Sequence, residues 1–433
     1  MNPTESPAID LLLNRNVRGL NPSPTLAINE RSNALRGKGR DIYKLGLGQS
    51  PFPVPPEVVE ALKAHAQEKD YLPVKGLAAL REAVAAYHRR VDGIDCEDDD
   101  VLIGPGSKEL IFLLQLVFDA TLVLPSPSWV TYAPQAAILG NTFHWVPTDA
   151  DDGWRLQPET LDRLGRDHPG ASFFILLNYP SNPTGQTYST THLQALTDVA
   201  RRHGMIFLSD EIYGAVHHDG AHASIATCYP EGTIVTAGLS KWCGAGGWRL
   251  GTSLFARPLR PLLDAVAAVA SETFTAVSAP IQYAAVRAFE GGLAIDRYLH
   301  QSQRILGALG RHCARRLHEA GTWVDLPEGA FYLFPDLTPL AASLHARGIH
   351  TSETLCERLL DDTGVAILPG SAFGRPSDEL TVRLAYVNFD GEKALAAAAD
   401  MPGSRTLDDD FLKTYCGRTV EGIERMCGWL ARV

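Results

Sequence analysis

The sequence lacks the features of a secreted, membrane-spanning or nucleic-acid-binding protein. No apolar run approaches the roughly 18 residues of a membrane-spanning helix, and the first residues lack the charged start, apolar core and cleavage site of a signal peptide. The net charge is −11, from Asp+Glu 50 against Lys+Arg 39. This balance argues against nucleic acid or an anionic membrane as a partner, because both require a basic face.

The cysteines also form no recognisable pattern. The seven lie at positions 96, 228, 243, 313, 356, 416 and 427, without a C-x-x-C pair or a His/Cys cluster of the zinc-binding type. An odd, scattered set is typical of reduced thiols, so we expect a cytoplasmic protein with no metal site. Cys243 lies two residues from Lys241, but no histidine is placed nearby in the sequence to activate it, so we expect it to pack.

What is present is the composition of a soluble globular protein, with 45% hydrophobic and 21% charged residues. A chain of 433 residues exceeds one ordinary core. We therefore expect two domains, or one large α/β domain with a smaller partner.

Apolar strands alternate with helical stretches, and a polar motif follows the end of each strand. The expected strands include residues 101–103, 121–125, 173–177, 205–209 and 233–237. Open α/β sheets bind ligands at the carboxyl ends of parallel strands, so these motifs should converge although they are far apart in the sequence. The Gly-rich turn 104–108 opens a helix and could bind an anion, although such turns are common for steric reasons alone.

The two ends of the chain lie outside this pattern. Residues 1–40 are loosely patterned, as in an arm that gains order by packing elsewhere. A helical tract over 278–318 leads to a second unit, with strands expected at 322–326, 331–334, 365–368 and 380–385. Residues 401–410 indicate a loop before a last helix at 420–433, and the sequence indicates no role for 401–433.

One stretch combines a lysine, several glycines and an arginine. Residues 239–251 read L-S-K-W-C-G-A-G-G-W-R-L-G. Lys241 could form a Schiff base with a carbonyl if its pKa were low enough to supply free amine. Arg249 offers a planar fork of donors that suits a phosphate. Pyridoxal 5'-phosphate (PLP), an aldehyde that carries a phosphate, could engage both; the alternative is a basic surface loop.

PLP chemistry also requires a carboxylate beside the pyridine nitrogen, so that the protonated ring can draw electrons from the substrate. Asp210, at the end of an expected strand, is the candidate. A turn or helix-capping aspartate is the alternative.

With these residues in place, the sequence resembles a fold-type I PLP enzyme of the class I/II aminotransferase family, of the aspartate aminotransferase-like kind. The matching motifs follow in the family's order: Y-x-x-x-x-G-x-x-x-L-R (71–81), N-x-P-x-N-P-T-G (178–185), D-E-x-Y (210–213), S-K-x-x-G-x-x-G-W-R-x-G (240–251), P-x-G-x-F-Y (327–332) and T-V-R-L (381–384). Their joint occurrence in order is far more specific than any one motif.

The resemblance implies an α/β fold. A large PLP-binding domain, with a mostly parallel central sheet sandwiched by helices, is accompanied by a smaller α/β domain built from both chain ends. The implied division is 1–49 for the N-terminal arm and part of the small domain, 50–294 for the large domain and 295–433 for the small C-terminal domain.

The resemblance also implies residue roles. Lys241 would hold PLP and move a proton, Asp210 would pair with the ring nitrogen, and Tyr213 and Asn182 would hydrogen-bond the phenolic oxygen. The remaining cofactor-binding residues would be Gly106, Ser107, Lys108, Ser240 and Arg249 at the phosphate, Trp129 on the ring face, and Tyr71, which would reach the phosphate of the neighbouring subunit in a homodimer. The substrate's α-carboxylate would be bound by Arg383, beside Asn182 and Gly48.

Two positions depart from the family pattern. Gly238 stands where many members carry a serine or threonine that binds the phosphate. The early motif reads G-Q-S-P at 48–51 rather than G-E-P-D, which leaves the substrate-side wall open.

The implied activity is transfer of an amino group between an α-amino acid and a 2-oxo acid, both small molecules. Alternatives within PLP chemistry are β- or γ-elimination or replacement, cyclisation of an adenosyl-methionine-type substrate, and oxidation. A ligand-sensing regulator is a distant alternative, because it needs an added DNA-binding domain. Lys108 either reaches the distal carboxylate of an acidic substrate or serves the phosphate alone.

Overall fold

The computed structural model describes residues 13–403 and 405–432. Its main feature is a seven-stranded sheet in the order β2-β8-β7-β6-β5-β3-β4. The strands are β2 (Val101–Gly104), β3 (Thr121–Ser126), β4 (Phe143–Pro147), β5 (Phe173–Asn178), β6 (Ile206–Asp210), β7 (Thr233–Gly238) and β8 (Gly251–Phe255). β4, β3, β5, β6 and β7 pair in parallel, whereas β8 is antiparallel to both of its neighbours.

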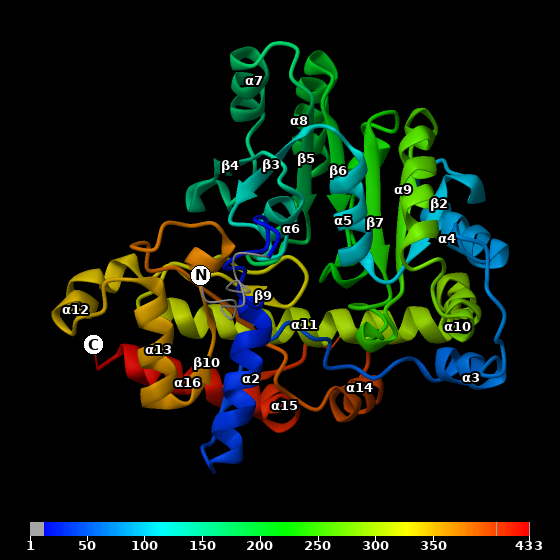
Figure 1. The fold of residues 1–433 in the computed structure, drawn as a ribbon. Coiled ribbons are helices and arrows are strands. Elements are labelled where there is room, and N and C mark those ends of the chain that lie inside the picture. The colour runs from blue at the N-terminus through cyan, green and yellow to red at the C-terminus, as the bar shows by residue number, and fades with distance from the viewer. Residues whose placement is uncertain (1–12, 404, 433) are drawn as a thin grey trace, which may run out of the picture.

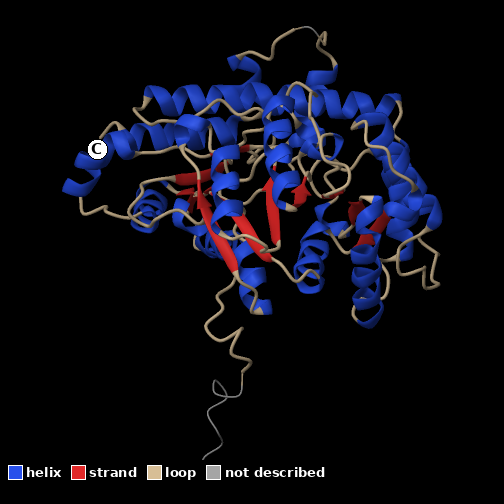
Figure 2. Cartoon of the chain, turned by 90° about the horizontal axis from the view of Figure 1, so that it is seen from above, coloured by secondary structure: helices blue, strands red, loops and turns tan. Residues whose placement is uncertain are grey.

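Helices cover both faces of this sheet (Figure 2). One face packs against α5 (Ser107–Val117), α6 (Tyr132–Leu139) and α9 (Arg260–Glu272). The other packs against α4 (Ala78–Val91), α7 (Pro158–Asp167), α8 (Thr190–His203) and α10 (Ala279–Glu290). Successive strand residues point to opposite faces, so Leu122 and Leu124 enter one core and Val123 the other. Strands buried on both sides require the continuous apolar runs seen in the sequence.

The second unit is built from both ends of the chain. The helix α11 (Leu293–Glu319) runs beneath the large sheet towards it (Figure 1). There, β1 (Tyr43–Lys44) pairs in parallel with β10 (Val365–Ala366). A three-stranded sheet has the order β11-β12-β9, formed by β9 (Tyr332–Leu333), β11 (Leu368–Pro369) and β12 (Val382–Ala385). The predicted fold class, a large sandwiched sheet with a smaller α/β unit from both ends, is confirmed.

The remaining helices surround these strands. They are α2 (Pro24–Gly37), α3 (Pro56–Ala64), α12 (Ala341–Ala346), α13 (Ser352–Thr363), α14 (Gly391–Ala399), α15 (Asp409–Tyr415) and α16 (Gly417–Leu430). None of the helices in the described ranges is long and apolar enough to cross a membrane. The same ranges contain no group of three or more His, Cys, Asp or Glu side chains able to hold a metal ion.

Several expected elements differ in the structure. Within the loosely patterned arm 1–40, residues 24–37 form the helix α2, which was not expected, while residues 1–12 lie outside the described residues. The tract 278–318 is two helices, because Gly291 and Gly292 adopt positive φ angles of 71° and 107° that end α10. In place of a strand at 322–326, Trp323 forms only an isolated bridge to Asp336. The last helix begins at Gly417, three residues earlier than expected, and is preceded by α15.

Candidate active site

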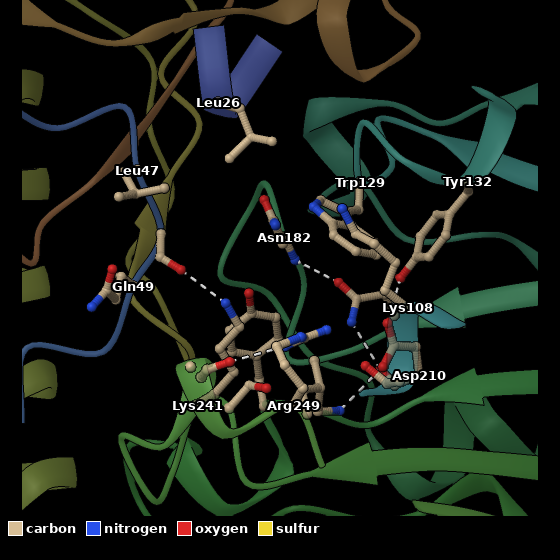
Figure 3. A pocket seen from close by; sticks show the side chains of 18 residues that line it. Leu26, Leu47, Gln49, Lys108, Trp129, Tyr132, Asn182, Asp210, Lys241 and Arg249 are labelled. Atoms are coloured by element: carbon tan, nitrogen blue, oxygen red, sulfur yellow. Dashed lines mark hydrogen bonds between the residues drawn. The ribbon is translucent and has the colours of Figure 1, made fainter. Parts of the chain in front are cut away.

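The predicted site residues converge at one edge of the large sheet. Asn182 follows β5, Asp210 and Tyr213 lie at and beyond the end of β6, and Lys241 follows β7. Arg249 precedes β8, and because β8 is antiparallel its start lies at the same edge as the other strands' ends. Figure 3 shows the cavity of about 570 Å³ between them.

The cavity brings together nearly all the residues named for cofactor binding. Its walls are Leu26, Leu47, Gly48, Gln49, Ser107, Lys108, Trp129, Tyr132, Asn178, Asn182, Asp210, Ile212, Tyr213, Ser240, Lys241, Gly246, Gly247 and Arg249. Leu26 and Leu47 lie across the cavity from Asp210 and Arg249 (Figure 3).

Lys241 places its amine inside this cavity. Its Nζ donates a hydrogen bond of 2.8 Å to the carbonyl oxygen of Gly48 and lies 5.5 Å from the ring centre of Tyr213. Burial, reinforced by the positive charge of Arg383, lowers the pKa of Lys241 to about 8. An appreciable fraction of the amine is therefore free near neutral pH, as nucleophilic attack on a carbonyl requires.

Asp210 supplies a buried carboxylate beside the cavity. Its Oδ2 accepts a hydrogen bond of 2.7 Å from the Tyr132 hydroxyl, and its Oδ1 accepts one of 3.3 Å from Thr236. Burial raises its pKa to about 6, and the Tyr132 hydrogen bond opposes this rise. Desolvation makes such a carboxylate a strong partner for a cationic N–H.

The opposite end of the cavity is built for an anion. Ser107 and Lys108 open α5, whose N-terminus presents unpaired N–H groups and the positive end of the helix dipole. Among the residues that the structure describes, the nearby Arg249 guanidinium donates only to the carbonyl oxygens of Gly246 and Pro105, at 3.0 and 3.3 Å. Burial and the charge of Arg249 both lower the pKa of Lys108. An anion placed here would relieve that repulsion.

The backbone around Arg249 is specialised for this contact. Arg249 itself adopts a left-handed conformation with φ 55°, which costs a non-glycine residue of order 1 kcal/mol or more. Gly106 has φ 93°, and a Cβ there would lie 2.3 Å from the Arg249 Nη2. The glycine is therefore required for the arginine to approach the turn before α5.

Trp129 supplies a flat aromatic wall. It packs edge-on against Tyr132 with ring centres 5.2 Å apart, and the Lys108 Nζ lies 4.9 Å from its ring centre. Asn182 is fixed by a 2.8 Å hydrogen bond from its backbone N–H to the Asn178 side chain.

Arg383 stands behind the cavity wall rather than on it. Its guanidinium donates to the carbonyl oxygen of Gly46 and, at 3.4 Å, to the Asn182 side chain, while its buried Nε has no hydrogen-bond partner in the described part of the chain. Gly48 leaves room for a protein side chain: a Cβ at Gly48 would lie 1.9 Å from the Tyr332 hydroxyl oxygen.

Tyr71 is the one predicted cofactor-binding side chain that lies away from the others. It is 92% exposed and does not line the cavity of its own chain. An aromatic side chain this exposed is free to contact a partner outside the chain, although single exposed apolar residues are also common on protein surfaces.

Sequence reasoning missed several residues of the site, and three of them have contacts that matter here. Tyr132 holds Asp210, Tyr332 contacts Tyr213 at 2.7 Å between hydroxyl oxygens, and Leu26 of α2 lines the cavity. Tyr332 ends the P-x-G-x-F-Y motif, so that motif was the available signal for it. The other two carried no comparable signal.

The residues present fit PLP. A depressed-pKa lysine can hold the aldehyde carbon, a buried carboxylate suits the ring N–H, and the cationic end suits the phosphate. The cavity of about 570 Å³ is in the range of small-molecule sites.

The chain is also similar to characterised proteins. The family model for aminotransferase class I and II matches residues 40–398. Aspartate aminotransferase of Geobacillus stearothermophilus is 33% identical over 385 residues, covering 86% of this chain and 94% of that protein. Aspartate/prephenate aminotransferase of Thermus thermophilus is 31% identical over 382 residues, with the same coverage of 86% and 94%. The solved structure of aspartate aminotransferase from Thermus thermophilus with maleate has a TM-score of 0.81 at 26% identity, covering 96% of this chain and 99% of that chain.

These three comparisons agree: the family model spans most of the chain, the relatives align over nearly their whole length, and the fold is shared. The chain therefore belongs to the class I and II aminotransferase family, and it is a PLP-dependent enzyme that transfers an amino group between an amino acid and an oxo acid.

Proposed function

We propose that the cavity at the sheet edge is the active site, that it holds PLP through Lys241, and that aspartate or glutamate is an accepted amino donor. The observation that carries the proposal is the desolvated amine of Lys241 in the cavity, with its pKa lowered to about 8, between a buried carboxylate and a cationic pocket. When bound, PLP supplies an aldehyde for imine formation and a protonated ring that accepts electrons from the substrate's Cα.

The catalytic roles follow from the positions of the side chains. Lys241 would hold the cofactor's aldehyde carbon, and its amine would carry the proton removed from the substrate's Cα. Asp210 would keep the proton on the ring nitrogen, because its desolvated carboxylate gains most from a cationic partner. Tyr213 and Asn182 would donate hydrogen bonds to the phenolic oxygen.

The phosphate is held at the start of α5. Gly106, Ser107 and Lys108 supply helix N-terminal N–H groups, and Arg249 supplies a bidentate fork, with Ser240 adding a hydroxyl. Trp129 would stack on the ring face. Arg383, beside Gly48 and Asn182, would bind the substrate's α-carboxylate.

Lys108 is the residue that carries the choice of donor. Its side chain lines the cavity, its ammonium lies over Trp129, and it is half-buried with no carboxylate partner among the described residues. A distal carboxylate would pair with it, whereas a neutral side chain would leave it unpaired in a desolvated site. Similar proteins include enzymes named aspartate aminotransferase and, from Streptococcus mutans, asparagine–oxo-acid transaminase.

The active unit is proposed to be a homodimer. The exposed side chain of Tyr71 is the candidate for a residue that reaches the partner's phosphate site. The seven cysteines are free thiols, which supports the expected cytoplasmic location.

A donor competition with Lys108→Ala tests the substrate assignment. We expect kcat/KM for aspartate or glutamate to fall by about 10²-fold, the loss typical of a buried charge pair, and kcat/KM for alanine to fall much less. Lys63→Ala on α3, whose ammonium pairs with Glu60 at the surface, is the matched control. An equal loss for acidic and neutral donors would assign Lys108 to the phosphate alone. Failure of the wild type to use either acidic donor would refute the substrate proposal.

A further inference from the structure

The P-x-G-x-F-Y segment at 327–332 ends in Tyr332, which contacts Tyr213 but does not line the cavity. Tyr332 begins β9 and is 1% exposed. Its hydroxyl oxygen lies 2.7 Å from that of Tyr213. We propose that Tyr332 is a positioning residue, which donates to the Tyr213 hydroxyl so that Tyr213 directs its own proton into the cavity, and whose ring supports Arg383. This inference rests on the proposed function.

Hydrogen-bond accounting fixes which hydroxyl donates. Tyr213 lines the cavity, whereas Tyr332 stands behind it. Within the described ranges, neither hydroxyl has a hydrogen-bond partner other than the other one. If Tyr213 donated to Tyr332, the Tyr332 proton would be buried with no acceptor, and an unsatisfied buried donor is unfavourable. If Tyr332 donates to Tyr213, both protons are used once a ligand in the cavity accepts from Tyr213.

The Tyr332 ring has a second contact. The guanidinium carbon of Arg383 lies 4.9 Å from its centre, and Phe373 covers the guanidinium at 5.3 Å. Two aromatic faces thus hold a buried cation whose Nε has no partner. Gly48 allows the tyrosine to occupy this place, because a Cβ there would lie 1.9 Å from the Tyr332 hydroxyl.

The direction of the Tyr213 proton has a measurable consequence. With PLP bound, loss of the proton on the Lys241 Schiff base nitrogen leaves more negative charge on the phenolic oxygen. A donor aimed at that oxygen favours the deprotonated form and lowers the pKa of the nitrogen. Removing the Tyr332 hydroxyl removes the donor that polarises the Tyr213 O–H, which weakens the hydrogen bond from Tyr213 to the phenolic oxygen, so that pKa should rise.

Absorbance titration of the holoenzyme measures this pKa without turnover. In Tyr332→Phe we expect the pH midpoint of the Schiff base band to rise by roughly 0.5 to 1 unit, the size of shift that one hydrogen bond to a charged oxygen produces. In Tyr213→Phe it should rise further. The double variant Tyr213→Phe/Tyr332→Phe should match Tyr213→Phe alone, because Tyr332 acts through Tyr213.

A second pair of variants separates the ring from the hydroxyl. Tyr332→Phe keeps the ring and should leave the amino donor KM within about twofold, whereas Tyr332→Leu should raise it by about tenfold through loss of the cation–π contact. An unchanged midpoint in Tyr332→Phe would overturn the inference, and so would shifts that add up in the double variant. The double variant remains decisive even if Tyr332→Phe loses stability, because the double variant leaves no orphan hydroxyl. Absence of any Lys241-dependent band in the wild type would instead refute the proposed function, and this inference with it.

Discussion

At the scale of single residues, the site depends on charges that are costly to bury. Asp210 is 2% exposed, and its pKa is raised to about 6 by burial. Tyr132 and Thr236 partly compensate this cost by donating hydrogen bonds. Such a carboxylate destabilises the folded protein without cofactor, and this unfavourable free energy is offset only when a cation binds beside it.

Asp210→Asn should separate these two effects. Without PLP, we expect the thermal midpoint at pH 8 to stay level or rise, because an amide removes the desolvated charge while still accepting from Tyr132. With PLP, kcat should fall by about 10²–10³-fold or more, the usual effect of losing one preorganised electrostatic partner. Calorimetry and steady-state kinetics measure both. Near-normal turnover would mean that another group holds the ring proton.

The sequence identified the residues whose signal is local. Asp210 and Lys241 each follow an apolar run, and that position in an α/β sheet is enough to place them at the ligand edge. Tyr132 and Tyr332 were missed because their contacts to Asp210 and Tyr213 join positions 78 and 119 residues apart. No local spacing encodes such a contact, so only the folded chain shows it.

At the scale of secondary structure, the buried strands and the last helix were predicted, whereas α2 near the N-terminal end was not. Strands such as β5 and β6 have continuous apolar runs because both faces are covered. α2 carries no comparable pattern: it is mostly exposed, with Ser32 its only fully buried residue. Its start is marked only by Pro24, a residue that suits the first helical position.

Gly238 departs from the family pattern of a serine or threonine at this position, and this departure has a structural reason. Gly238 ends β7 opposite Gly251 of β8, with φ 154°. A Cβ there would lie 2.6 Å from the Leu250 carbonyl oxygen. The serine or threonine found in many family members does not fit this backbone, and Ser240 is the hydroxyl that reaches the cavity instead.

Part of the segment 401–433, for which the sequence indicated no role, packs against the strand that leads to the cavity wall. α16 packs on β1, where Arg418 and Arg425 lie 4.0 and 4.7 Å from the ring centre of Tyr43. The Tyr43 hydroxyl also donates to Glu421. β1 leads directly to Leu47–Gln49 in the cavity wall, so α16 fixes the start of that wall.

At the scale of the whole molecule, the site lies where the two units meet. Lys241 comes from the large sheet, whereas Arg383 comes from β12 of the smaller sheet and Gly48 from the segment after β1. Both chain ends must therefore pack correctly before the cavity closes. The order of motifs predicted this convergence, but the contribution of a second subunit at Tyr71 stays a prediction.

Mixed dimers test whether Tyr71 acts across subunits. Tyr71→Ala and Lys241→Ala should each be impaired as homodimers. In a hybrid, one site would carry both changes and the other neither, so a random mixture should recover about a quarter of wild-type activity. Activity is assayed after co-refolding, with each variant refolded alone as the control. No recovery, or full activity of Tyr71→Ala alone, would place Tyr71 outside the partner's site.

The most direct test of the central claim is to trap the covalent bond at Lys241. Borohydride reduction of the PLP-loaded protein, followed by peptide mass mapping, should place one pyridoxyl phosphate adduct on the peptide that contains Lys241. This lysine is the one whose buried amine has its pKa lowered to about 8. In Lys241→Ala, the adduct, the visible absorbance band and the aminotransferase activity should all be lost, while Lys75→Ala, whose ammonium pairs with Asp264, should keep all three. An adduct on another lysine, or an unchanged band in Lys241→Ala, would contradict the account.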